Sequence, residues 1–147
     1  MAFINRCFVN NFCRWCSIFV AALLLGSCSS TENVSKAEGQ IPHFRQLMTE
    51  RQFAQIYAET SDDFKKVTTA KDFIDLLAAV DRKLGAVKDT TKNGWNLNYY
   101  PSGTFVTLRF KTQFERGSGE ETFTYRVGDG KALLVGYHIT SNGLIAN

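Results

Sequence analysis

The larger part of this sequence contains no cysteine. All four cysteines, Cys7, Cys13, Cys16 and Cys28, lie near the N-terminus of the 147-residue chain. A disulfide framework or a thiolate metal site needs several cysteines in the folded part of a protein, so both are excluded for the chain after Cys28. Cys13 and Cys16 have the C-x-x-C spacing of redox motifs. That chemistry needs a folded helix N-terminus to lower a thiol pKa, whereas these cysteines lie in a segment typical of a leader.

Histidine is scarce as well, and neither sign of charge dominates. His43 and His138 are the only histidines, and they are not spaced as ligands of one zinc ion, which needs three or four. We expect no metal and no cofactor. Two of the 17 basic residues, Arg6 and Arg14, precede Cys28 and no acidic residue does, which leaves 15 basic against 14 acidic residues. A nearly neutral domain is not expected to bind nucleic acid.

The chain also lacks an apolar run long enough to cross a bilayer as a helix. The almost unbroken run at 15–25 is far shorter than the roughly 20 residues that a transmembrane helix needs. Its length, and the positive charges before it, are typical of a signal peptide. The run ends in Leu25-Gly26-Ser27-Cys28, which resembles the bacterial lipobox, where the cysteine thiol receives the lipid. The sequence therefore predicts a lipoprotein signal peptide over 1–27 and lipidation of Cys28. The alternatives are an uncleaved anchor and a secretory peptide that is cut elsewhere.

Lipid on Cys28 would anchor the protein to a membrane of the bacterial cell envelope. Several acyl chains, palmitate among them, hold a protein firmly. Ser29 stands where an aspartate would mark retention in the inner membrane, which favours the outer membrane, facing the periplasm. The segment 28–39 is polar and nearly free of large apolar groups, so we expect a lipidated tether. The remainder, 40–147, is predicted to be a single domain.

Helical periodicity marks the first half of this domain. The apolar residues of 70–84 recur at one helix face, Thr69 precedes them as a cap, and Gly85 ends them. These signals predict a helix over 70–84. Shorter apolar stripes between 41 and 59 predict either one kinked helix or two.

Alternation of apolar and polar residues, with a period of two, marks the second half. It occurs around Leu97, Leu108, Tyr125 and Tyr137, and short turns rich in glycine separate the four segments. Such segments predict four strands in an antiparallel meander. One face is apolar and the other mixed, so helices should cover one side only. The prediction is an α+β domain, in which N-terminal helices precede a four-stranded antiparallel meander curled around helix 70–84.

Several stretches of the domain carry a family resemblance. They are Asp72–Leu77 running into Lys83–Gly85, then Thr112–Gly117 with Glu120 and Glu121, and finally Val135–Ile139. Together they resemble small secreted or lipid-anchored bacterial domains of unknown function in the cystatin-like and NTF2-like fold group. The resemblance implies a curved sheet that wraps a helix and can leave a conical pocket. It brings no catalytic residues with it.

The polar groups expected on the apolar strand faces are the hydroxyls of Tyr99, Tyr125 and Tyr137. They could be half-buried core residues, or they could line a pocket and donate hydrogen bonds to a ligand. By alternation we assign no acidic residue to these apolar faces. An NTF2-like isomerase would need a carboxylate or histidine inside such a pocket.

These observations favour a non-catalytic, membrane-anchored envelope lipoprotein. We expect its domain to bind a partner protein of the envelope or a small apolar ligand, and a homodimer is compatible with the fold group. The alternative is an NTF2-like enzyme, of the isomerase or hydrolase type, that uses a pocket in the curved sheet. A solid core with an exposed apolar patch of several hundred Å² would favour the protein partner, and a cavity with several convergent polar groups would favour the ligand.

Overall fold

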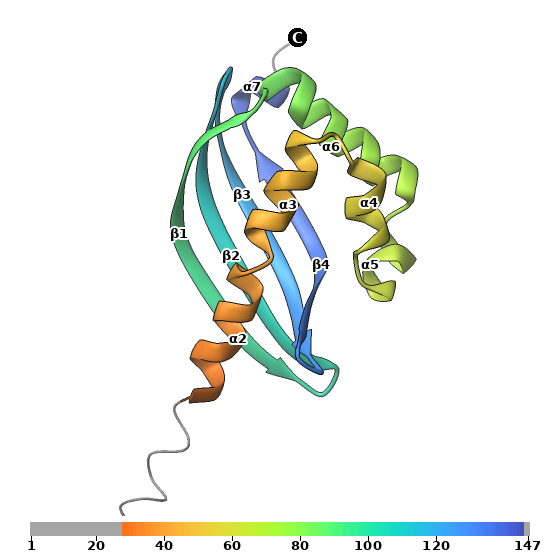
Figure 1. Ribbon diagram of the computed structural model, residues 1–147, viewed down its shortest axis with the longest axis vertical. Helices are drawn as coiled ribbons and strands as arrows, with labels where there is room; N and C mark the ends of the chain where they lie inside the picture. Colours follow the sequence, from red (N-terminus) through yellow and green to blue (C-terminus); the bar gives the residue numbers. More distant parts are fainter. Residues whose placement is uncertain (1–27, 146–147) are drawn as a thin grey trace, which may run out of the picture. The chain divides into compact units, whose positions relative to one another are not determined.

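The computed structural model describes residues 28–145. The predicted signal peptide, 1–27, and the side chain of Cys28 lie outside this part. The chain divides into two units, Met1–Glu32 and Asn33–Asn147, and the domain described here is the second. It consists of helices followed by a sheet of four strands (Figure 1).

The segment expected to be a tether is helical. Helix α2 spans Cys28–Glu38, and its residues Val34 and Ala37 are 7% and 0% exposed in the core. Residues 33–38 are therefore part of the domain and not of a tether, and the domain begins by Asn33 instead of at residue 40. Val34 and Ala37 are small, but they continue at helical spacing the apolar stripe of the next helix. Gly39 interrupts that stripe between the two helices.

Four further helices precede the sheet. Helices α3 (Ile41–Thr49) and α4 (Phe53–Ala58) are separate, which decides between the two alternatives for 41–59. Between them Arg51 adopts a positive φ of 56° that a continuous helix does not allow. Helix α5 covers Asp62–Val67 and helix α6 covers Ala70–Leu84.

Helix α6 confirms the prediction over 70–84. The Thr69 side chain accepts a hydrogen bond of 3.1 Å from the backbone N–H of Asp72, which satisfies a free donor of the first turn. At the other end Gly85 has a φ of 79°, a conformation that glycine adopts without strain.

The sheet confirms the antiparallel meander. Its strands are β1 (Val87–Tyr100), β2 (Gly103–Phe114), β3 (Gly117–Gly128) and β4 (Lys131–Thr140), and they lie in chain order. Every neighbouring pair is antiparallel. Strand β1 starts well before the alternation around Leu97. Its first half is polar and exposed, so this half shows no alternation of apolar and polar residues. A short helix, α7 (Asn142–Ile145), follows β4.

One face of the sheet carries the core. Helix α3 crosses this face (Figure 1), and its Phe44 ring lies 5.0 Å from that of Phe123 on β3 and 5.3 Å from that of Tyr137 on β4. Helix α6 contributes Phe73, whose ring is 6.2 Å from that of Tyr137. The end of α6 packs in a second cluster, made of Val80, Leu84, Phe114 and Ile139. The sheet thus packs against α3 as well as helix 70–84, and α3 covers its middle.

Candidate functional site

A buried ion pair joins helix α3 to the centre of the sheet. On α3, Phe44 and Leu47 point into the core, and Arg45 lies beside them with 16% of its side chain exposed. Glu121 follows the alternation of β3 and lies on the same face as Phe123, with a side chain that is 0% exposed. The Arg45 guanidinium donates to both Glu121 oxygens, at 2.9 Å from Nη1 to Oε1 and through a second, shorter bond from Nη2 to Oε2.

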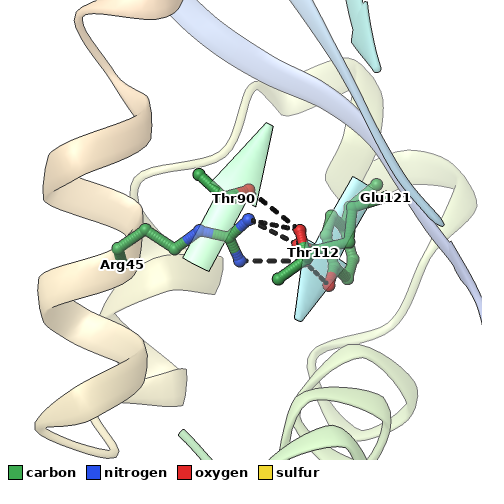
Figure 2. Close-up of polar contacts among 5 residues, drawn as sticks. Arg45, Thr90, Thr112 and Glu121 are labelled. Carbon is green, nitrogen blue, oxygen red and sulfur yellow. Dashed lines mark hydrogen bonds and ion pairs between the residues drawn. The ribbon is translucent and has the colours of Figure 1, made fainter. Parts of the chain in front are cut away.

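Hydroxyl groups complete the cluster. Tyr137 Oη donates to Glu121 Oε1 at 2.7 Å, and Thr112 Oγ1 donates to Glu121 Oε2. Thr112 Oγ1 also lies 3.0 Å from Thr90 Oγ1 and 3.4 Å from Arg45 Nη2. Figure 2 shows Arg45 of α3 and Thr112 of β2 beside this carboxylate, and Thr90 of β1, which reaches it through Thr112. We call Arg45, Thr90, Thr112, Glu121 and Tyr137 the Glu121 cluster.

The cluster compensates for the burial of its charges. A carboxylate offers about four acceptor positions, and Glu121 receives four donors, two from Arg45 and one each from Thr112 and Tyr137. Burial, and then the neighbouring Glu121 charge and hydrogen bond, raise the pKa of Tyr137 well above its ordinary value. The Arg45 guanidinium also lies 5.4 Å from the centroid of the Phe123 ring. Its Nε is buried and finds no hydrogen-bond partner within 28–145.

Sequence reasoning missed this cluster. The apolar strand faces were expected to carry no acidic residue, and that expectation is wrong for Glu121. The alternation contained the signal, because Glu121 precedes Phe123 and Tyr125 at a spacing of two. The alternation could not reveal the ion-pair partner of Glu121, because Arg45 is 76 residues away in the chain.

The three tyrosines proposed to line a pocket do not converge on one. Tyr125 and Tyr137 belong to the core, where both rings contact Phe123, at 6.5 Å and 5.0 Å. Burial raises the pKa of Tyr125 as well. Tyr99 is 62% exposed on the edge strand β1. Tyr125 and Tyr137 thus pack in the core, Tyr125 also lines the groove described below, and Tyr99 is a surface residue.

A first cleft, of about 600 Å³, opens beside the Glu121 cluster. The ends of α3 and α6, the start of β1 and the β2–β3 turn form its walls, and Arg45 and Thr90 line it. Other charged side chains that line this cleft already form ion pairs or hydrogen bonds within the domain. Arg51 Nε lies 2.9 Å from an Asp81 carboxylate oxygen, and Arg116 donates to the carbonyls of Asp81 and Arg82 at 2.9 Å. Arg116 thereby caps the C-terminal end of α6.

A second opening, of about 410 Å³, lies between α3, α4 and β4, and we call it the α3–α4–β4 groove. Its rim includes the imidazole of His43, whose Nε2 is 2.7 Å from Glu59 Oε2. The other histidine, His138, is exposed and lies outside the groove, where its Nε2 is 3.0 Å from Thr140 Oγ1. The floor is apolar and is made of Phe44, Leu47, Ile56, Tyr125, Ala132 and Leu134. An apolar floor with a polar rim is the usual composition of a binding site.

Within residues 28–145, no three His, Cys, Asp or Glu side chains gather as metal ligands. No helix in that part of the chain is long and apolar enough to span a membrane.

A family model described as a protein of unknown function (DUF4019) matches residues 43–137, which is most of the domain. The match includes every member of the Glu121 cluster and most of the α3–α4–β4 groove. No curated protein matches the chain.

Proposed function

The chain belongs to the DUF4019 family, and we propose that it is a non-catalytic, lipid-anchored domain that binds a partner protein in the bacterial cell envelope. The observation that carries this proposal is the state of the Glu121 carboxylate. It is 0% exposed and receives four hydrogen-bond donors. A general base must reach the proton that it abstracts, directly or through one water. This carboxylate has neither access nor a free acceptor position, so it supports a structural role over an isomerase or hydrolase.

The packing of the sheet favours a partner protein over a ligand held inside the fold. Leu77, Leu108 and Phe123 are each 0% exposed, so the space between the sheet and its helices is filled. Of the two openings described above, the α3–α4–β4 groove has the more apolar lining. A groove of this kind accepts apolar side chains that project from a partner, as in the groove recognition of short segments.

We also propose that the domain is of the cystatin-like and NTF2-like type. A four-stranded antiparallel sheet with helices packed on one face supports this assignment. The lipobox-like Leu25-Gly26-Ser27-Cys28 supports the signal peptide and the lipid on Cys28, and Ser29, which follows it, supports the outer-membrane location.

The lipid anchor is tested on the full chain expressed in a bacterial host. Cys28→Ala should abolish incorporation of labelled palmitate and leave an uncleaved precursor. The matched control is Ser29→Ala, which should be labelled and processed normally. Continued labelling and membrane fractionation of Cys28→Ala would refute the anchor.

The partner is tested by photo-crosslinking in intact cells. A photoreactive residue in place of His43 lies at the groove rim, and one in place of the exposed Arg109 lies on the uncovered face of the sheet. We expect one discrete crosslinked protein from position 43, and we expect Leu133→Asp, in the groove wall, to abolish it. A mass increase of a few hundred daltons at position 43 would identify a small apolar ligand instead and contradict the partner protein. Equal products from both positions would also contradict it.

A further inference from the structure

Strand β1 is an open edge of the sheet. Among the described strands it pairs only with β2, and most of its 14 residues are exposed. The opposite edge, β4, is different, because the backbone N–H of Ser61 donates to its Leu134 carbonyl at 3.0 Å. An edge strand presents unpaired N–H and C=O groups that can pair with another chain.

The two halves of β1 are not equally open. The first half carries Lys88 and Lys92, and its pairing with β2 shifts register between Val87 and Asp89 and again between Lys92 and Gly94. Charges and bulges of this kind discourage edge pairing. From Gly94 to Tyr100 the pairing with β2 is regular. This second half carries no charge.

Large aromatic side chains are exposed along the regular half. Trp95, Tyr99 and Tyr100 are 48%, 62% and 58% exposed. Trp95 and Leu97 lie opposite Leu108 and Val106, which are buried. Because side chains alternate along a strand, Trp95, Leu97 and Tyr99 project on the core face, and Asn96 and Asn98 project on the other.

The residue types of 95–99 form a near-palindrome, namely aromatic, Asn, Leu, Asn, aromatic. An antiparallel pair of two such strands, with its two-fold axis at Leu97, sets Trp95 opposite Tyr99 of the second copy and Asn96 opposite Asn98. Cross-strand aromatic pairs stabilise a sheet. The same axis sets Gly94 opposite Tyr100 of the second copy. A Cβ at Gly94 would meet nothing within 4 Å, so there is room for an aromatic ring to cover that glycine.

We propose that two copies of this chain associate through the 94–100 segment of β1 and form one continuous eight-stranded sheet. Two observations select a second copy over an unrelated segment. The sequence is self-complementary about a two-fold axis, as a symmetric dimer requires, and no like charges meet across that axis. The inference is independent of the proposed anchor and partner, because it uses neither Cys28 nor the α3–α4–β4 groove.

Disulfide trapping on the full chain, in its host membrane, tests this register. Directly opposed Cα atoms in an antiparallel pair lie about 4.5–5.5 Å apart, which is within the range of a disulfide. Leu97→Cys should therefore give a reducible dimer under mild oxidation. Thr91→Cys, exposed on the same strand, would lie away from Thr91→Cys of the second copy and should form no disulfide-linked dimer on a non-reducing denaturing gel, and neither should the unsubstituted chain. Equal dimer from Thr91→Cys and Leu97→Cys would overturn the proposal.

A second measurement does not depend on an added cysteine. The molar mass of the purified chain, from light scattering, should correspond to two copies, and Asn96→Asp with Asn98→Asp should reduce it to one copy. That variant sets acidic side chains against each other across the axis, and its circular dichroism spectrum should match that of the parent. A monomeric parent at all concentrations would overturn the proposal. An unchanged mass for the double variant would also overturn it. So would a monomeric chain whose exposed aromatic residues bind phospholipid vesicles and not a second copy.

Discussion

Glu121 on β3 and Trp95 on β1 project from the same face of one sheet, yet the carboxylate is buried and the indole is 48% exposed. The difference lies in what covers each strand. Helix α3 lies over β3 and supplies Arg45, whereas Trp95 lies at the open edge of the sheet. Burial at this sheet thus follows the position of α3 and not the polarity of the residue. Substitutions in the Glu121 cluster should therefore affect stability, and substitutions at the β1 edge should affect association.

The largest effect is expected from Arg45→Met. It leaves the Glu121 carboxylate buried without its counter-charge, which costs about 3–5 kcal/mol of the free energy of unfolding. Urea unfolding measures this loss. Combining Arg45→Met with Glu121→Leu should recover much of it, because an apolar pair replaces the isolated charge. If Arg45→Met alone changed stability by less than about 1 kcal/mol, the Glu121 cluster would not be buried as described.

Alkaline pH should lower the free energy of unfolding of the domain through two buried tyrosines, Tyr125 and Tyr137. Burial raises the pKa of Tyr125 and Tyr137 in the folded state. Below pH of about 10 both hydroxyls are neutral in both states. Above it the unfolded chain loses these protons and the folded chain keeps them. The free energy of unfolding should then fall by about 1.4 kcal/mol per pH unit for each tyrosine. Urea unfolding between about pH 9 and 11 should show a smaller slope for Tyr125→Phe with Tyr137→Phe, and an unchanged slope would refute the assignment.

Tyr137→Phe at neutral pH should cost about 2 kcal/mol, because it removes a hydrogen bond to a buried charged acceptor. Tyr125→Phe is the matched control, since Tyr125 packs in the same core cluster but is not a donor to Glu121. Its cost should be clearly smaller. Equal losses in the two variants would show that packing, and not the bond to Glu121, makes Tyr137 important.

The smallest effect is expected at the open edge. Tyr99→Thr replaces an exposed ring with another good strand former, so unfolding at low protein concentration should change by less than about 0.5 kcal/mol. The same variant should weaken association. A large loss of stability at low concentration would mean that the edge is covered, and the contrast with the Glu121 cluster would disappear.

Helix 70–84 and the meander were predictable because their signals are local. Thr69, Gly85 and the apolar stripe between them lie within one short segment, and the strands show alternation with tight turns. Helix α2 was missed because its apolar residues are only Val34 and Ala37, and Gly39 separates them from the stripe of α3.

The candidate site was less predictable, because burial is not a local property. Alternation assigns Glu121 and Tyr99 to a face of the sheet. It cannot say that α3 brings Arg45 onto Glu121 from 76 residues away, or that Tyr99 lies at an uncovered edge. A charge stays buried only when such a distant partner compensates for it.

The sequence separation of Arg45 and Glu121 also has a consequence for the order of folding events. The strands pair with their chain neighbours through short turns, so the sheet can form from contacts that close small loops. Arg45 reaches Glu121 only when α3 docks on a sheet that already exists. We expect the ion pair to be absent from the folding transition state. Arg45→Met should then accelerate unfolding while leaving the folding rate nearly unchanged, so the pair determines how long the folded domain persists and not how quickly it forms.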